Sequence, residues 1–181
     1  MKTANTSLVI AAFASWHESH DAARLALDNG LRLIEHCALE TYSVLTRLPP
    51  PHRIFGIVAR EFLAARFAQP FLRLSAKVYK EFILELSDHG ITGGAAYDAL
   101  VAATAADFGA ELVTCDRRAM PGYERYGLRT QLIISTARRA SSCLSVCRTD
   151  KSVSPICAAR LRVSKYSCAS GHFFRYSGLA K

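Results

Sequence analysis

The chain has 181 residues, about the length of one domain, and half of its residues are hydrophobic, so a buried core is expected. The longest uncharged apolar stretch near the start, residues 8–16, is far shorter than the ~20 residues that a membrane-spanning helix needs. Residues 15–18 are typical of a helix start and not of a signal-peptide cleavage site. These features predict a cytoplasmic protein without a membrane segment.

The net charge of +8 is unevenly distributed. Residues 1–128 carry 13 basic and 14 acidic side chains, whereas residues 129–181 carry 10 basic side chains and only one acidic one, Asp150. This second segment also holds ten serines and four of the six cysteines. The asymmetry predicts a folded domain over residues 1–134 and a poorly ordered basic extension over residues 135–181, of the kind that a frame change or read-through produces.

The extension leaves two other interpretations open. Its basic charge suits electrostatic binding to nucleic acid. Its cysteines suggest zinc, but they do not form two closely spaced pairs and the segment holds a single histidine, so this interpretation is disfavoured. The side chains concerned are Cys143, Cys147, Cys157, Cys168 and His172.

In residues 1–134, short apolar runs alternate with helical patterns. The capping pair Ser15 and Glu18 predicts a helix that starts at Trp16, and Thr92 is expected to cap another. The predicted elements are, in order, a strand at 1–5, a segment at 6–13 that continues it or begins a helix, a helix at 16–29, a helix ending at Leu48, a helix through 55–63, a strand at 71–74, helices at 78–86 and 92–108, a strand at 111–114, a short turn or helix at 117–125 and a strand at 128–134. The alternation predicts an α/β fold: a three-layer sandwich with a mostly parallel central sheet flanked by helices.

Three acidic residues stand out from this pattern. Glu40 shares an apolar helical row with Leu33, Cys37 and Val44, and Asp98 shares one with Val101 and Ala105. Asp116 directly follows the apolar run 112–115, where ligand sites of parallel sheets lie. Each acid alone is more typical of the edge of an apolar stripe or of an ion pair with arginine.

If the three acids converge, their mutual repulsion needs a cation. Mg²⁺ and Mn²⁺ prefer oxygen ligands, and a carboxylate cluster that holds such an ion suits phosphodiester hydrolysis.

Two other motifs do not carry a site. His17 and His20 are three residues apart, whereas the HExxH zinc signature needs four. No GxGxxG follows a strand, which argues against a Rossmann-like nucleotide binder.

The chain resembles PIN-domain ribonucleases, specifically VapC-type toxins of type II toxin–antitoxin systems, over residues 1–134. The resemblance rests on the order and separation of four segments: Asn5-Thr6-Ser7-Leu8-Val9, Leu39-Glu40-Thr41-Tyr42-Ser43-Val44-Leu45-Thr46-Arg47-Leu48-Pro49, Gly93-Gly94-Ala95-Ala96-Tyr97-Asp98-Ala99-Leu100-Val101-Ala102 and Leu112-Val113-Thr114-Cys115-Asp116-Arg117-Arg118. It implies a Mg²⁺-dependent endoribonuclease, with Mn²⁺ as a substitute, that acts on RNA, is silenced by a cognate VapB-type antitoxin and forms a homodimer.

The resemblance also implies a four-acid metal site, in which Glu40, Asp98 and Asp116 match the second, third and fourth acids as catalytic residues and metal ligands. The first position, usually aspartate, is Asn5 here. Asparagine keeps a carbonyl oxygen for a metal but not the negative charge, so weakened activity is expected, and a catalytically impaired antitoxin-binding module is the alternative.

The implied roles are as follows. Asp98 and Asn5 flank the principal metal, and either Glu40 or Asp116 orients the attacking water. Arg117 and Arg118 are expected to bind RNA phosphates, and Thr6 and Thr114 are also expected around the substrate. Thr6, Ser7 and Thr114 are candidates for holding waters or carboxylates of the site.

Overall fold

The computed structural model describes residues 1–135. The predicted extension lies outside the described residues except for Ser135, and so do the cysteines and the histidine considered for zinc. The division of the chain at residue 134 therefore stays a prediction.

A four-stranded parallel sheet forms the centre of the described residues, with the strand order β2-β1-β3-β4. The strands are β1 (Lys2–Ala4), β2 (Arg32–Leu33), β3 (Glu111–Thr114) and β4 (Thr130–Leu132). In the register, Ala4 pairs with both Leu33 and Val113. The predicted parallel α/β architecture is confirmed.

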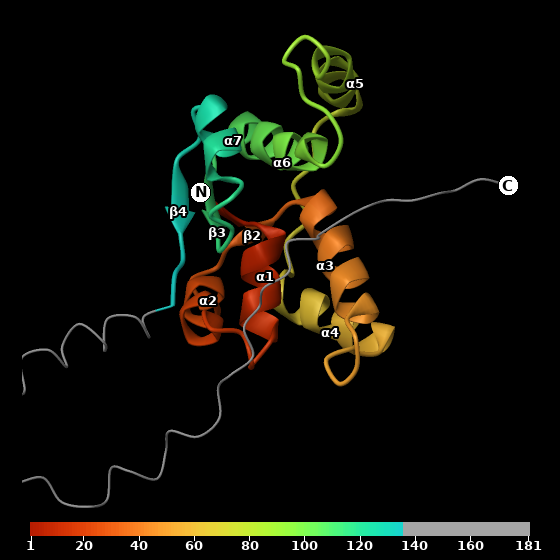
Figure 1. The fold of residues 1–181 in the computed structure, drawn as a ribbon, viewed down its shortest axis with the longest axis vertical. Coiled ribbons are helices and arrows are strands. Elements are labelled where there is room, and N and C mark those ends of the chain that lie inside the picture. Colours follow the sequence, from red (N-terminus) through yellow and green to blue (C-terminus); the bar gives the residue numbers. More distant parts are fainter. Residues whose placement is uncertain (136–181) are drawn as a thin grey trace, which may run out of the picture. The chain divides into compact units, whose positions relative to one another are not determined.

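Seven helices accompany the sheet within residues 1–135, and the sheet lies between them in a three-layer arrangement. Helices α1 and α2 pack together, as do α6 and α7 (Figure 1). The helices are α1 (Thr6–Phe13), α2 (His20–Asp28), α3 (Glu35–Arg47), α4 (Gly56–Arg66), α5 (Ala76–Glu85), α6 (Ala95–Asp107) and α7 (Met120–Arg125).

Apolar side chains from the strands and from α1 fill the core. This agrees with the short apolar runs predicted for the strands, because a strand of a parallel sheet covered by helices buries both of its faces. The largest fully buried side chains of the sheet and its neighbours include Leu8, Val9, Leu33, Ile34, Leu45, Leu112, Val113 and Tyr123.

Two predictions about strands need correction. The strand β2 was not predicted, since it has only two residues. The predicted strand at 71–74 is absent: only Leu72 bridges to Ile34, through hydrogen bonds to its neighbours Leu33 and Glu35. Pro70 lies just before this bridge and has no N–H to extend the pairing.

Two helix starts also differ from prediction. Helix α2 begins at His20 and not at Trp16, because tight turns follow α1: His17 N–H donates to Ala14 and His20 N–H donates to His17. Helix α6 begins at Ala95, with Gly94 and not Thr92 at its cap. Gly93, with a left-handed φ of 57°, interrupts the helical path between Thr92 and Ala95.

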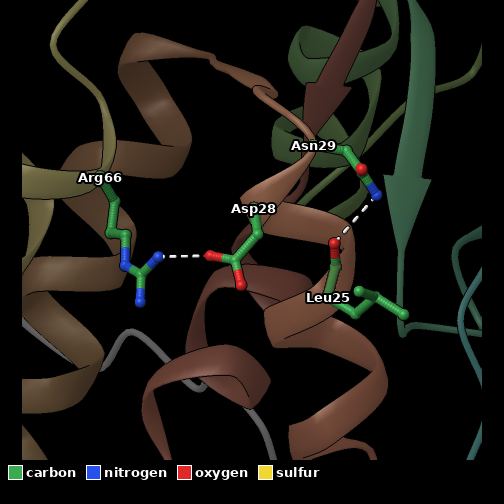
Figure 2. Close-up of polar contacts among 4 residues, drawn as sticks. All are labelled: Leu25, Asp28, Asn29 and Arg66. Carbon is green, nitrogen blue, oxygen red and sulfur yellow. Dashed lines mark hydrogen bonds and ion pairs between the residues drawn. The ribbon is translucent and has the colours of Figure 1, made fainter.

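The end of α2 agrees with prediction. Gly30 has the left-handed φ of 76° that ends the helix, and Asn29 Nδ2 donates to the carbonyl of Leu25 at 2.9 Å. Asp28 pairs with Arg66 at the end of α4, which ties the two helices together (Figure 2). Because this ion pair is largely exposed, its contribution to stability is small.

No helix within residues 1–135 has the length and apolar character to cross a membrane.

Candidate active site

The site lies at the carboxyl edge of the sheet. Asn5 directly follows β1 and caps α1, and its N–H donates to the carbonyl of Val113 in β3. Thr114 ends β3, and Asp116 follows two residues later. Glu40 is in the second turn of α3, and Asp98 is in the first turn of α6. Parallel strands end at one edge, so residues from distant parts of the sequence meet there.

The side chain of Asn5 is buried, with 7% exposed, and the protein satisfies its hydrogen bonds on every side. Its Oδ1 accepts from the N–H of Thr6 at 2.6 Å and from the thiol of Cys37 at 3.8 Å. Its Nδ2 donates to Thr114 Oγ1 at 3.1 Å and to Tyr123 Oη at 2.9 Å. Because a backbone N–H only donates, Thr6 determines which end of the amide carries oxygen.

The ionisation of the neighbouring groups agrees with these donor roles. Burial raises the pKa of the Cys37 thiol to about 12, so the thiol stays protonated and donates to Asn5. Burial, and then the charge of Asp98, raise the pKa of Tyr123 above its ordinary value. The phenol therefore also keeps its proton.

Tyr123 links Asn5 to Asp98. Its oxygen accepts from the amide of Asn5, so its own proton is available to Asp98 Oδ1, 3.5 Å away. Tyr123 was not predicted as a site residue, because it lies in a six-residue helix without a clear apolar period. It is fully buried beneath the site.

Asp98 shows that the acids interact. It keeps access to solvent, yet the burial of the rest of its surface raises its pKa, and the negative charges of Asp116 and Glu40 raise it further. The hydrogen bond from Tyr123 opposes this shift. The three carboxylates are thus within electrostatic reach of one another.

Each of the other two acids has its own partner. Thr6 Oγ1 donates to Glu40 Oε2 at 2.6 Å, and the backbone N–H of Arg118 donates to Asp116 Oδ1 at 2.8 Å. The ion pairs formed among residues 1–135 include none of the three acids. Their negative charge is therefore not neutralised by a basic side chain in this part of the chain.

The acids do not form a preformed metal site: within residues 1–135, no group of three or more His, Cys, Asp or Glu side chains is arranged to hold a metal ion. The donors are nevertheless the hard oxygens that Mg²⁺ and Mn²⁺ prefer, and their charge lacks a counterion. The residues thus fit a divalent ion in chemistry and charge, and binding would require the acids to move closer together. That they share a metal stays a prediction.

The two threonines predicted around the substrate are occupied within the protein. The hydroxyl of Thr6 holds Glu40. Thr114 is fully buried, and its oxygen accepts from Asn5 Nδ2 and from the N–H of Asp116 at 3.0 Å. With both lone pairs used, its proton donates to Ser7 Oγ, 3.0 Å away. These contacts place Thr6, Ser7 and Thr114 as supports of the acids and Asn5, and leave Thr114 no surface for RNA.

Arg117 and Arg118 are exposed directly after Asp116. No salt bridge within residues 1–135 involves either guanidinium. Both are therefore free of acidic partners there, as the prediction of phosphate contacts requires.

An aromatic pair beside the acids was also not predicted. The ring of His36 in α3 stacks on the ring of Tyr97 in α6, with 5.1 Å between ring centroids and 4° between planes. Tyr97 lies in the first turn of α6 and is 52% exposed.

The comparisons with known proteins agree with this geometry. Residues 5–125, two thirds of the chain, match the PIN domain family. The chain belongs to the PIN-domain family.

Within that family, the chain is of the VapC type. It is 49% identical over 129 residues to Ribonuclease VapC40 of Mycobacterium tuberculosis, a match that covers 71% of this chain and 96% of the relative. It is 43% identical over 118 residues to Ribonuclease VapC27 of the same organism, which covers 65% of this chain and 79% of that relative.

The crystal structure of FitAcB from Neisseria gonorrhoeae has the same fold as this PIN domain. The two superpose with a TM-score of 0.52 at 18% identity, over 72% of this chain and 96% of that one.

The hydrogen bonds of Tyr123 predict a measurable role in stability. The Tyr123→Phe variant leaves one amide hydrogen of Asn5 and Oδ1 of Asp98 without a partner. We expect the free energy of unfolding to fall by about 1–3 kcal/mol in urea titrations at neutral pH without metal. Tyr126→Phe is the matched control, since its hydroxyl makes no hydrogen bond within residues 1–135. A loss no larger than that of the control would contradict this role.

Proposed function

We propose that this PIN domain is a metal-dependent endoribonuclease, the toxin component of a type II toxin–antitoxin system that acts in the cytoplasm. Both relatives are named ribonucleases. The observation that carries the proposal for this chain is that Glu40, Asp98 and Asp116 meet at the carboxyl edge of the sheet while no salt bridge within residues 1–135 involves them. In agreement, the charges of Asp116 and Glu40 add to the effect of burial and raise the pKa of Asp98. A group of neighbouring carboxylates without a basic partner suits a divalent cation.

In this proposal Glu40, Asp98 and Asp116 would hold the ion. Asn5 would contribute its neutral Oδ1 only by giving up a hydrogen bond that this oxygen accepts from Thr6 or Cys37. When bound, Mg²⁺ or Mn²⁺ lowers the pKa of a coordinated water and screens the charge of the phosphate. Hydrogen bonds from Thr6, Tyr123 and the Arg118 backbone hold the acids at this edge of the sheet, and the acids would move closer together from there to share the ion.

The substrate contacts follow from charge. Residues 1–128 are close to neutral, so a local patch and not the overall charge must bind RNA. Arg117 and Arg118 provide guanidinium groups that match phosphate oxygens. Either Glu40 or Asp116 orients the attacking water.

The direct test is RNA cleavage by the purified full-length chain with Mg²⁺ or Mn²⁺, and again with excess EDTA. Cleavage in the presence of either ion and loss of cleavage with EDTA are the expected results. A variant with Glu40→Gln serves as the control against a contaminating nuclease, since its activity must fall. Cleavage that persists in EDTA would contradict the proposal.

The network around Asn5 favours a second candidate, a catalytically impaired antitoxin-binding module. The amide nitrogen faces Thr114 and Tyr123, and the position carries no charge for a metal. Antitoxin binding without cleavage in Mg²⁺ or Mn²⁺ would favour this candidate over the nuclease.

An apolar cavity of about 520 Å³ provides a surface for the antitoxin in either case. Its walls come from α3, α4 and the segment that follows α4. The residues that line it are Tyr42, Gly56, Ile57, Arg60, Leu63, Ala64 and Phe71. A docked helix or extended segment with apolar side chains fits such a surface.

Helix α5 is the surface proposed for a homodimer. None of its residues is fully buried within residues 1–135, and its half-buried Val78 and Phe82 line a pocket with Ala103 and Asp107 of α6. Tyr79, Ile83 and Leu84 are exposed on it. Exposed apolar residues on one helix are typical of an interface between protein chains.

A further inference from the structure

The stacked rings of His36 and Tyr97 form a feature that the proposed chemistry does not use. The rings are parallel, and Nε2 of His36 is buried without a hydrogen-bond partner among residues 1–135. Ring contact therefore holds the pair in place, in addition to the packing of the two helices. Because 52% of Tyr97 is exposed, much of its ring surface remains open to solvent.

The position of the pair connects it to the acids. His36 precedes Glu40 by one helical turn on α3, so both side chains lie on the same face of that helix. Tyr97 directly precedes Asp98 on α6. Helices α3 and α6 contact each other, and the ring stack is part of that contact. Because the ring of Tyr97 stacks on His36, which shares a face of α3 with Glu40, it lies on the Glu40 side of the site where the scissile phosphate is proposed to bind.

The electrostatics of the site determine what such a ring can bind. The carboxylates repel the RNA backbone, and the domain has no general positive charge to offset this. Stacking on an aromatic ring attracts a base without any charge and accepts all four bases. Only an unpaired base exposes its faces in this way, because the bases of a duplex already stack on each other.

We propose that Tyr97, supported by His36, is a stacking platform for an unpaired nucleobase next to the phosphodiester that is cut. This inference rests on the proposed nuclease function and adds the requirement for a single-stranded substrate at the cut site. His36 is a positioning residue, since it acts by holding the tyrosine ring.

The test measures RNA binding apart from cleavage. Full-length protein is titrated in EDTA with single-stranded oligoribonucleotides that carry 2-aminopurine at successive positions, and affinity is read by anisotropy and stacking by fluorescence quenching. We expect one position to be quenched by the parent. Tyr97→Ala should weaken binding at least about fivefold and remove the quenching, whereas Tyr97→Phe should keep both.

Two controls isolate the stacking contact. Phe108→Ala removes another exposed aromatic side chain, 41% exposed, from the far end of α6 and should bind RNA like the parent. An oligonucleotide that lacks the base at the quenched position should bind the parent and Tyr97→Ala equally well. Thermal unfolding of each variant shows that the fold is retained.

Several results would overturn the inference. They are parent-like RNA binding by Tyr97→Ala, a loss in Tyr97→Phe as large as in Tyr97→Ala, absence of RNA binding by the parent, or an effect of Tyr97→Ala confined to antitoxin binding. Cleavage is measured separately with Mn²⁺. RNA binding that depends on Tyr97, without cleavage, would support the stacking platform and contradict the proposed nuclease function. Cleavage together with RNA binding that does not depend on Tyr97 would support the nuclease function and contradict the stacking platform.

Discussion

Replacing Asn5 by aspartate is expected to raise metal-dependent RNA cleavage by about 10- to 100-fold. The substitution is isosteric and adds a negative charge beside Glu40, Asp98 and Asp116, and ligand charge helps to set the affinity of oxygen sites for divalent ions. The measurement is the initial rate of cleavage of one RNA over a range of Mg²⁺ and Mn²⁺ concentrations. The metal-ion concentration that gives half of the maximal cleavage rate should be lower for the variant than for the parent.

The hydrogen-bond network indicates a second consequence of Asn5→Asp. A carboxylate only accepts, so the hydroxyls of Thr114 and Tyr123 must turn to donate to it, and Asp98 then loses the proton of Tyr123. Without metal, this variant should unfold at a lower temperature than the parent. Added Mn²⁺ should raise the unfolding temperature of the variant by more than it raises that of the parent.

The control for this prediction adds the same charge elsewhere. Asn29 ends α2 just before β2 begins, and thus lies at the opposite, amino edge of the sheet. Asn29→Asp should change neither the cleavage rate nor the response to Mn²⁺. Equal activity of the parent and Asn5→Asp would show that charge at residue 5 does not limit this enzyme.

Replacing Asp98 by asparagine is expected to reduce cleavage by at least about 100-fold, both in the parent and in the Asn5→Asp background. Asp98 interacts with both other acids, and the loss of a metal-ion contribution costs several kcal/mol of transition-state stabilisation. Asparagine retains an oxygen that accepts from Tyr123, so the fold should persist. Cleavage rates and Mn²⁺-dependent unfolding temperatures of the variants provide the measurement.

Without metal, Asp98→Asn should be more stable than the parent at neutral pH. The raised pKa of Asp98 means that its charged form destabilises the folded state, and the folded state binds more protons than the unfolded state between the ordinary aspartate pKa and the raised one. Stability of the parent therefore falls as pH rises through that interval, and the advantage of the variant should vanish below it. A stability difference that does not depend on pH would contradict this explanation.

Local patterns were enough to predict most elements of the fold. The apolar rows of α3 and α6 and the short apolar run of β3 have the periods of their structures, and Cys37 and Val44 of the predicted α3 row are buried. Leu33, which was predicted in the same helical row, is also buried but belongs to strand β2, because α3 begins only at Glu35. Helix starts were less predictable, because tight turns before His20 and the left-handed Gly93 override the nearby capping residues.

By itself, the sequence determined the alternation of strands and helices, and the position of Glu40, Asp98 and Asp116 within apolar rows or after a strand, since both follow from periods of a few residues. Only the tertiary structure decided which groups face one another. Asn5 and Tyr123 are 118 residues apart, and His36 and Tyr97 come from different helices. The order of strands and the contact of α3 with α6 bring these side chains together, and no local propensity encodes such long-range contacts.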